Sequence, residues 1–473
     1  MAEPDQWDLV VIGGGSAGLT AARTAAGFGA RVLLIERDRL GGDCLWTGCV
    51  PSKALIAAAR HSAEQTSAST PHARQTTFAA AMAGVQAAVA AVAPSDSRES
   101  LEAAGVAVRM GEARFTSDRA LVVDGDRIGF QQAVIATGTK PRMPQIDGAD
   151  AVHIRSSGDI WQLERLPERL VILGGGPIGC EIGQAMARLG SHVTIVQRGA
   201  RLLAKEDAAA SAIVEAALRA DGVDVRTGRS AASVRSEDGV AGELTLDDGV
   251  MVPFDVLLAA TGREAHTTDL GFEAAGVRVD ADGFIEVDAS MRTSAPTIWA
   301  AGETAGLPQL THIAGVTGSL AATNAILGLR RAFDRDRTPR VTFTSPEVAS
   351  IGVLPDRADR RRHRVIEWQH AHVDRAIADG DTSGCTTIVV DGRGRIVGGT
   401  IVGPRAGETM GELSLAVHAG LTTTDIAGTT HHYPTYNDAL WNAAITDYRA
   451  RSRSGATGKA IGVLRGLTAR RRR

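Results

Sequence analysis

Two stretches of the sequence share one order of features, and this repeat limits the fold more than anything else in the chain. Each stretch begins with an apolar strand, passes through a glycine-rich turn into a helix of about a dozen residues, and ends in a second apolar strand. The stretches run from Trp7 to Glu36 and from Leu170 to Gln197. Their turn glycines are Gly13, Gly15 and Gly18 in the first and Gly174, Gly176 and Gly179 in the second.

Glycines at these positions let the backbone turn tightly and approach a pyrophosphate, whose charge then lies against the free amides of a helix N-terminus. A single copy is weak evidence, because glycine also lets a helix pack closely on a sheet. Here each copy reaches the end of its second strand 18 residues after its last glycine. The repeat therefore predicts an α/β fold with two Rossmann-like dinucleotide-binding domains and electron transfer between two dinucleotides.

The two second strands end differently. Glu36 can accept hydrogen bonds from an adenosine ribose, so an unphosphorylated ribose suits the first site. Its counterpart is Gln197, followed by Arg198 and Arg201. The second site thus lacks the acid that would repel a 2′-phosphate and has two cations to attract one. This favours NADPH over NADH there, with ordinary surface arginines as the alternative.

A pair of cysteines, Cys44 and Cys49, follows the first stretch within the segment Gly41 to Lys53. A regular helix separates Cα atoms five positions apart by about 8.7 Å, more than the roughly 7 Å that a disulfide tolerates. Gly48 and Pro51 supply the backbone freedom and the break that a bridged, irregular turn requires. Placement near a helix N-terminus favours the thiolate that attacks in disulfide exchange. Two buried thiols are the simpler alternative, and no second pair of ligands at zinc-like spacing accompanies them, so we expect no metal site.

Composition sets broader limits. A chain of 473 residues with 44% hydrophobic side chains is long enough for about three domains. No basic start or apolar h-region precedes Trp7, so we expect a cytoplasmic protein. The uncharged run from Phe78 to Ala93 is expected to be a buried helix rather than a membrane span. Cys180 and Cys385 lie in apolar patterns and are interpreted as small core residues.

The cysteine segment resembles the redox signature of the class I pyridine nucleotide-disulfide oxidoreductases, a family that includes dihydrolipoamide dehydrogenase, glutathione reductase and mercuric reductase. The resemblance extends from Asp8 to about Asp447. Besides both nucleotide stretches it takes in Ala136-Thr137-Gly138, Ala260-Thr261-Gly262 and the segment Phe343 to Ala349.

This resemblance implies a domain order and a homodimer. Residues 1–150 and 266–338 would form the FAD-binding domain, residues 151–265 the NAD(P)-binding domain, and residues 339–448 a dimerisation domain of α+β type. Cys49 would face the flavin, Cys44 would attack the acceptor, and Lys53 would lie by flavin N5 with Glu181 as its partner. The resemblance adds further cofactor-binding residues, namely Gly42, Thr137, Gly138, Gly262, Gly302 and Glu303.

The sequence departs from the family pattern near its C-terminal end. Tyr433 stands where disulfide-reducing relatives carry a proton-transferring histidine, and Asp438 stands where they carry glutamate. A phenol of pKa about 10 moves protons poorly at neutral pH, whereas an imidazole of pKa about 6.5 does so well. His431 or His432 is a candidate replacement, although solvent-facing or capping histidines are the simpler interpretation. Glu303 also stands where the family usually has aspartate, which should shift a flavin ribityl contact without abolishing it.

These departures point to an FAD-dependent NAD(P)H oxidoreductase that passes electrons to a small-molecule acceptor and is similar to mercuric reductase in its tyrosine. The chain has no cysteine after Cys385, and so lacks the C-terminal cysteine pair of that enzyme. A dihydrolipoamide dehydrogenase or low-molecular-weight disulfide reductase is the first alternative. A flavin-binding redox sensor or scaffold with incidental turnover is the second.

The last residues, 449–473, carry nine Lys or Arg and no acid. We expect a flexible solvated tail and no specific nucleic-acid binding. The alternative is weak contact with an anionic membrane through a short apolar stripe formed by Ile461, Val463, Leu464 and Leu467.

Overall fold

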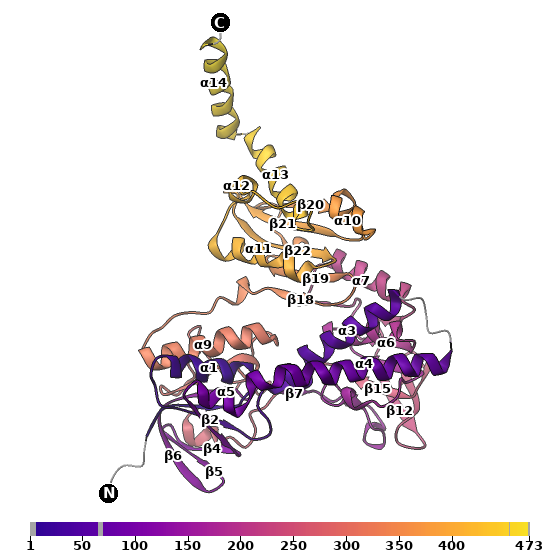
Figure 1. The fold of residues 1–473 in the computed structure, drawn as a ribbon, viewed down its shortest axis with the longest axis vertical. Helices are drawn as coiled ribbons and strands as arrows, with labels where there is room; N and C mark the ends of the chain where they lie inside the picture. The colour runs from indigo at the N-terminus through magenta and orange to yellow at the C-terminus, as the bar shows by residue number, and fades with distance from the viewer. Residues whose placement is uncertain (1–5, 65–69, 454, 472–473) are drawn as a thin grey trace. The chain divides into compact units, whose positions relative to one another are not determined.

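The computed structural model describes residues 6–64, 70–453 and 455–471. The chain divides into two compact units. The first comprises residues 1–198 and 222–335, and the second comprises residues 199–221 and 336–473. Figure 1 shows both units as mixtures of helices and strands, as expected for the α/β fold class.

The first unit contains a parallel sheet built on the N-terminal repeat, in the order β3-β2-β1-β6 with β17 beside β6. Its strands are β1 (Trp7–Ile12), β2 (Val32–Glu36), β3 (Val106–Met110), β6 (Asp126–Ile135) and β17 (Ile298–Ala300). The early half of β6 continues as an antiparallel meander with β5 (Ala120–Val123) and β4 (Ala113–Ser117). Helices α1 (Ser16–Gly27) and α9 (Thr311–Leu327) pack closely, because Gly318 lets its backbone lie against Ala17.

A second parallel sheet in the same unit is built on the second repeat, in the order β11-β10-β9-β15-β8. Its strands are β8 (Arg155–Ser156), β9 (Arg169–Leu173), β10 (His192–Gln197), β11 (Asp224–Thr227) and β15 (Val256–Ala259). Helix α6 (Pro177–Arg188) follows β9. An antiparallel sheet of β12 (Ala231–Ser236), β13 (Gly242–Leu246) and β14 (Met251–Phe254) shares a core with it.

The chain passes between the two parallel sheets twice, and the two passages pair with each other. Strand β7 (Thr139–Pro141) belongs to the outward passage and β16 (Arg263–Ala265) to the return, and they form an antiparallel ladder. The short 3-10 helix η3 (Ile160–Gln162) lies further along the chain, between β8 and β9 of the second sheet.

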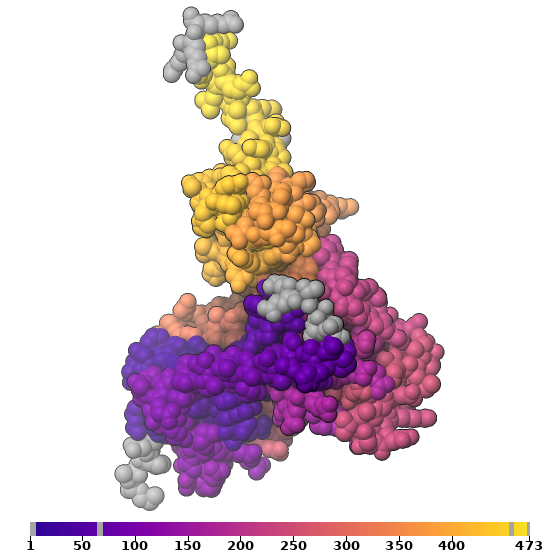
Figure 2. Space-filling view, turned by 45° about the vertical axis from the view of Figure 1, so that its right-hand side comes forward, coloured from indigo at the N-terminus to yellow at the C-terminus, as the bar shows by residue number. Residues whose placement is uncertain are grey.

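Helices α2 (Gly42–Trp46), α3 (Cys49–Glu64) and α4 (Pro71–Val92) follow β2. The helical run Pro71–Ala103 is long and apolar enough to cross a membrane, with a window of mean hydropathy 1.6, of which 22% is buried. Buried side chains on α4 recur every three or four residues, at Phe78, Ala81, Val85 and Val89. The expectation of a buried helix is therefore right for one face only, and the indigo to violet atoms of this region lie on the surface in Figure 2.

The second unit is built on an antiparallel sheet in the order β18-β19-β22-β21-β20. Its strands are β18 (Arg340–Thr342), β19 (Glu347–Gly352), β20 (His363–Gln369), β21 (Cys385–Asp391) and β22 (Ile396–Gly403). Helices α11 (Ala406–Ala419) and α13 (Asp438–Ser452) contribute to its core. Helices α7 (Ala208–Ala220), α10 (Asp374–Asp379) and α12 (Thr423–Gly428) complete it.

The basic tail is helical where it is described. Residues Arg449 and Arg451 end α13, and α14 spans Gly455–Arg471. The composition did not indicate this helix, and the four apolar residues of the stripe are exposed. Residue 454 and the last two arginines lie outside the described residues.

Candidate functional site

The turn after β1 is shaped by backbone contacts that no side chain would permit. Gly13 has a φ of +105°, and an added Cβ would lie 2.4 Å from the carbonyl oxygen of Ala136. Gly42 has a φ of +58°, and its Cβ would lie 2.7 Å from the Cα of Gly15. Two separate glycine-rich turns therefore meet at the N-terminus of α1. The carboxylate of Glu36 accepts a hydrogen bond from the Gly14 amide at 2.6 Å, which places it beside this turn.

The turn after β9 repeats this geometry. Gly174 has a φ of +115°, and its Cβ would lie 2.3 Å from the carbonyl oxygen of Ala260. Gln197 accepts a hydrogen bond from the Gly175 amide at 2.9 Å, in the position that Glu36 takes in the first copy. Arg198 is exposed. Arg201 donates to the carbonyl oxygens of Ala204 and Glu206 and lies 3.9 Å from Asp356.

The two predicted redox cysteines lie at a break between two helices. Cys44 lies within α2, and Cys49 is the first residue of α3. The break falls at Thr47 and Gly48, whereas Pro51 lies inside the first turn of α3, where its missing amide costs no helical hydrogen bond. Both cysteines are free thiols, partly buried and hydrogen-bonded to each other.

The surroundings of this pair stabilise a thiolate on Cys49. A hydrogen bond from Cys44 lowers the pKa of Cys49 to about 6, in spite of burial, with further help from Thr311 and the charge of Lys53. The Thr311 hydroxyl lies 3.1 Å from the Cys49 sulfur, at the N-terminal end of α9. The same hydrogen bond and burial raise the pKa of Cys44, which therefore holds the shared proton.

Lys53 and Glu181 come together from helices far apart in the sequence. The Lys53 ammonium on α3 donates to the Glu181 carboxylate on α6 at 2.8 Å. The Glu181 side chain is 7% exposed and that of Lys53 is 37% exposed. Because a buried carboxylate needs a partner, this ion pair ties the cysteine-bearing helix to the helix that opens the second glycine turn.

A family model with the description pyridine nucleotide-disulphide oxidoreductase matches residues 7–318. The dimerisation domain of the same enzymes matches residues 338–444. The chain belongs to this family. This chain is 36% identical to mercuric reductase from Streptomyces lividans, over 93% of this chain and 96% of that protein. It is 34% identical to dihydrolipoyl dehydrogenase from Thermus scotoductus, with the same coverage of each.

Solved structures agree with this membership. The HOCl-induced flavoprotein disulfide reductase RclA from Escherichia coli, as a Cu(II) complex, superposes with a TM-score of 0.84 at 26% identity. That match covers 94% of this chain and all of RclA. LpdA from Mycobacterium tuberculosis also gives a TM-score of 0.84, at 27% identity over 93% of this chain and 99% of LpdA. The chain is thus an FAD-dependent NAD(P)H oxidoreductase that self-associates through its C-terminal domain.

The glycine turns of this oxidoreductase fit both nucleotides. Gly15 and Gly42 bring their two backbones together at the N-terminus of α1, so neither residue has a side chain that would block a pyrophosphate there, and Glu36 lies beside this turn for a ribose. Gly176 has no heavy atom within 4 Å of its hypothetical Cβ, which leaves the N-terminus of α6 open as well. When bound, the flavin supplies hydride acceptance from the nicotinamide and passes electrons to sulfur.

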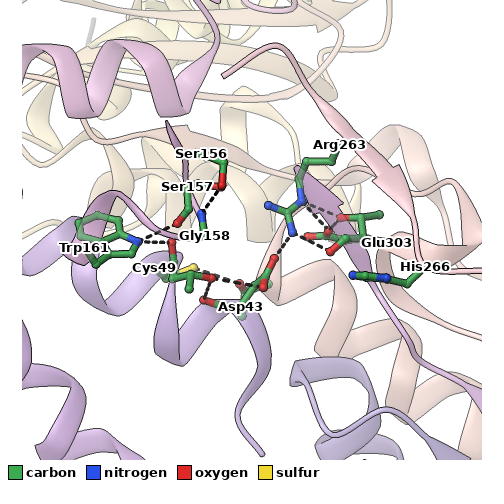
Figure 3. Close-up of polar contacts among 12 residues, drawn as sticks. Asp43, Cys49, Ser156, Ser157, Gly158, Trp161, Arg263, His266 and Glu303 are labelled. Atoms are coloured by element: carbon green, nitrogen blue, oxygen red, sulfur yellow. Dashed lines mark hydrogen bonds and ion pairs between the residues drawn. The ribbon is translucent and has the colours of Figure 1, made fainter. Parts of the chain in front are cut away.

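A network around Arg263 was not anticipated from the sequence. Figure 3 shows this guanidinium between Asp43 and Glu303. Arg263 donates to the Asp43 carboxylate and lies 3.3 Å from the Glu303 carboxylate, while the Thr139 hydroxyl also donates to Glu303. Glu303 is therefore already engaged by protein groups. Its neighbour Gly302 has a φ of +73° and lies near Ala17 at the start of α1.

The other predicted flavin-domain residues lie next to this network. The Thr137 hydroxyl donates to the carbonyl oxygen of His266 at 2.7 Å, and the amide of His266 donates to the carbonyl oxygen of Gly138. Gly262 immediately precedes Arg263 and has a φ of +130°. The two Ala-Thr-Gly turns thus begin the ladder of β7 and β16. Arg263 directly follows the second of these turns, and this position in the sequence could have identified it as part of the site.

The tyrosine segment lies in the second unit. The Tyr433 hydroxyl donates to Asp374 at 2.6 Å, a contact that raises the pKa of the phenol, and the side chain is 71% exposed. Asp438 accepts hydrogen bonds from the amide and hydroxyl of Thr435. It therefore holds its own turn together instead of orienting a proton-transfer group.

The two nearby histidines differ in their surroundings. His431 contacts two acceptors, the Thr429 carbonyl oxygen at 3.0 Å and the Glu412 carboxylate at 2.8 Å. Both ring nitrogens are thus occupied. His432 is exposed and lines a cavity of about 290 Å³ together with Arg375 and Arg405. Cys180 and Cys385 are buried, as expected of core residues.

Proposed function

We propose that this enzyme reduces an acceptor through the dithiol of Cys44 and Cys49, with Cys44 as the attacking sulfur and Cys49 facing the flavin. Lys53, held by Glu181, would lie by the flavin ring. The observation that carries the proposal is the pair of free thiols at a helix break, with the Thr311 hydroxyl 3.1 Å from the Cys49 sulfur; these surroundings lower the pKa of Cys49 to about 6 and leave the proton on Cys44. The Cys49 thiolate is the form that reacts with the flavin, and Cys44 becomes the attacking sulfur once it has released its proton, because the thiolate is the nucleophile.

We further propose that the acceptor takes up electrons from the dithiol without also taking up protons. Oxidation of the dithiol to the bridge releases two electrons and two protons. A disulfide acceptor takes up both protons as its two thiols form, so it needs a group that delivers them. A metal ion takes up only the electrons. Tyr433, whose hydroxyl is committed to Asp374 and whose pKa is raised, suits the second kind of acceptor better.

Steady-state turnover tests this proposal directly. We expect turnover with Hg²⁺ or a related thiol-reactive metal ion to exceed turnover with lipoamide or small disulfides, and Cys44→Ser to abolish it. Quinones and oxygen complete the acceptor panel. Activity that survives in Cys44→Ser would mean that the flavin reduces the acceptor directly, and higher turnover with lipoamide would favour a dihydrolipoamide dehydrogenase.

We propose NADPH as the preferred donor. Gln197 stands where the first site has Glu36, and the adjacent Arg198 is exposed, which leaves its guanidinium accessible to a 2′-phosphate. Arg201 is engaged by carbonyl oxygens, so its contribution is expected to be smaller. The ratio of kcat/KM for NADPH to that for NADH should exceed one and should fall several-fold in Arg198→Ala. If this ratio were the same in Arg198→Ala as in the wild type, the role of Arg198 in selecting NADPH would be contradicted.

We propose two further properties. One is the set of domain boundaries expected from the sequence, 1–150 with 266–338, 151–265 and 339–448, of which the match of the dimerisation domain to residues 338–444 supports the last. Dependence on a nicotinamide donor and four free cysteines support a cytoplasmic location.

We also propose weak binding of the tail to anionic lipid. The basic helix α14, with Leu464 and Leu467 exposed, supports this contact. Phosphatidylserine vesicles should sediment the full chain, and a chain ending at Arg453 should stay in solution. Failure of the full chain to sediment would contradict this binding.

A further inference from the structure

The segment that carries both cysteines, Gly42–Cys49, is held at two points by residues that lie far from it in the sequence. We call this segment the redox loop. One contact comes from β16, on the return passage between the two parallel sheets, and the other from η3, between β8 and β9 of the second sheet. Neither contact involves the cysteines themselves.

Arg263 makes the contact at the start of the loop. Its guanidinium donates to Asp43, the residue before Cys44, and to the hydroxyl and carbonyl oxygens of Thr139 at 2.6 and 2.9 Å. It also lies 3.3 Å from Glu303. The side chain is only 12% exposed, so this cation is surrounded by its acceptors and fixed in one orientation.

Trp161 makes the contact at the end of the loop. Its indole N–H donates to the carbonyl oxygen of Thr47 at 2.9 Å and to that of Ser157 at 2.8 Å. The residue is 8% exposed. Figure 3 shows the Trp161 ring on one side of the redox loop and Arg263 on the other. Thr47 is the residue at which the helix breaks between the cysteines, so Trp161 fixes the break itself.

We infer that Arg263 and Trp161 are positioning residues that hold the two sulfurs in bridging geometry. The inference deepens the proposed function and rests on it. Bridge formation transfers two electrons and two protons from the Cys44 and Cys49 thiols to an oxidant, here oxidised dithiothreitol, which becomes its dithiol. An immobilised loop raises the effective concentration of one thiol at the other, because less chain entropy is lost when the bridge closes. Loss of either clamp therefore shifts this equilibrium toward the open dithiol.

The test measures the bridge itself and needs no acceptor. The purified FAD-containing protein is equilibrated without oxygen in mixtures of oxidised and reduced dithiothreitol, quenched with acid, and alkylated. The fraction of bridged Cys44–Cys49 peptide is then read by mass spectrometry. We expect the equilibrium constant for bridge formation to fall by about threefold or more in Arg263→Gln and in Trp161→Phe, the scale of one net hydrogen bond.

Lys140→Gln is the matched control. Lys140 lies on the same ladder and forms an ion pair with Glu264 at 2.9 Å, but both side chains are about half exposed and this pair lies apart from the redox loop. The equilibrium constant for bridge formation in Lys140→Gln should equal that of the wild type. In Trp161→Phe the FAD content and the rate of flavin reduction by NADPH should also be unchanged, which a general loss of structure would not allow.

An equilibrium constant that stays at the wild-type value, or rises, in either clamp variant overturns the inference. If Arg263→Gln does not retain FAD, Arg263→Lys replaces it, since lysine keeps the charge at Asp43 but not the fork toward Thr139. Failure of the proposed function is recognised separately, by turnover that persists in Cys44→Ser.

Discussion

At the scale of single residues, the Cys49 thiol has a pKa that its environment lowers strongly. Four neighbours act on its pKa in known directions, and the largest effect is the hydrogen bond from Cys44. Thr311 and the charge of Lys53 lower this pKa as well, whereas the charge of Glu181 raises it. The thiolate therefore depends on a balance that single substitutions can shift either way.

We predict a graded response of this pKa. Cys44→Ala should raise it most, from about 6 toward the value of an ordinary thiol, because the main donor is lost. Thr311→Val should raise it less, and Lys53→Met less again. Glu181→Gln should lower it, because a negative charge near the thiolate disappears. Thiolate absorbance of the reduced protein, followed against pH, measures each value.

The opposite signs of Lys53→Met and Glu181→Gln make this prediction strict. Both variants break the same ion pair, so a loss of structure would move the pKa in the same direction in both. If the pKa of Cys49 moved in the same direction in both variants, this would contradict the electrostatic explanation. The exposed Lys140→Gln serves as the unaffected reference.

At the scale of elements, the meeting of two glycine turns forms the first nucleotide site. Gly42 combines a left-handed φ of +58° with a Cβ position only 2.7 Å from the Cα of Gly15. Alanine at this position would be strained by about 1–2 kcal/mol and would also separate the turns. We therefore predict that Gly42→Ala loses at least about tenfold in FAD affinity, measured by flavin fluorescence on dilution.

Gly27 provides the comparison for this substitution. It lies at the end of α1, has no left-handed φ, and has no heavy atom within 4 Å of its hypothetical Cβ. Gly27→Ala should keep wild-type FAD affinity. If both variants lost FAD equally, the cause would be general destabilisation and not the loss of the close contact between Gly42 and Gly15.

At the scale of the whole molecule, a buried histidine in the second unit links stability to pH. His370 is 1% exposed, and burial lowers its pKa to about 4. Its ring lies so close to Gly403 that a Cβ there would approach the Nδ1 atom to 2.5 Å. The unfolded chain binds a proton below about pH 6.5 that the folded chain refuses until about pH 4, so stability falls as pH falls through this window.

We predict that this histidine contributes up to about 3 kcal/mol to the loss of stability across that window. His370→Gln should lower the thermal midpoint at neutral pH, because a fitted ring is lost. It should also shrink the drop in the midpoint between about pH 7 and pH 4.5. The exposed His432→Gln should show the wild-type drop, and an equal drop in His370→Gln would show that other groups control acid unfolding.

The sequence by itself determined the repeated glycine turns, because their conformations follow from local sterics: Gly13 and Gly174 take φ values that only glycine adopts freely. It also indicated the redox pair and the family, since a motif of fixed spacing is a local property. What it could not determine were contacts between residues remote in the chain.

Only the tertiary structure decided that Arg263 holds Asp43, that Thr311 faces Cys49, and that Tyr433 is committed to Asp374. Nothing in their own segments indicates the partners of Arg263 or Thr311, and nothing around Tyr433 in the sequence indicates Asp374 as its partner. The partner of each lies 59 to 262 positions away, and packing of separate elements brings the two together. The single-sided exposure of α4 has the same origin, because composition gives the hydropathy of a helix but the neighbouring helices determine which face is covered.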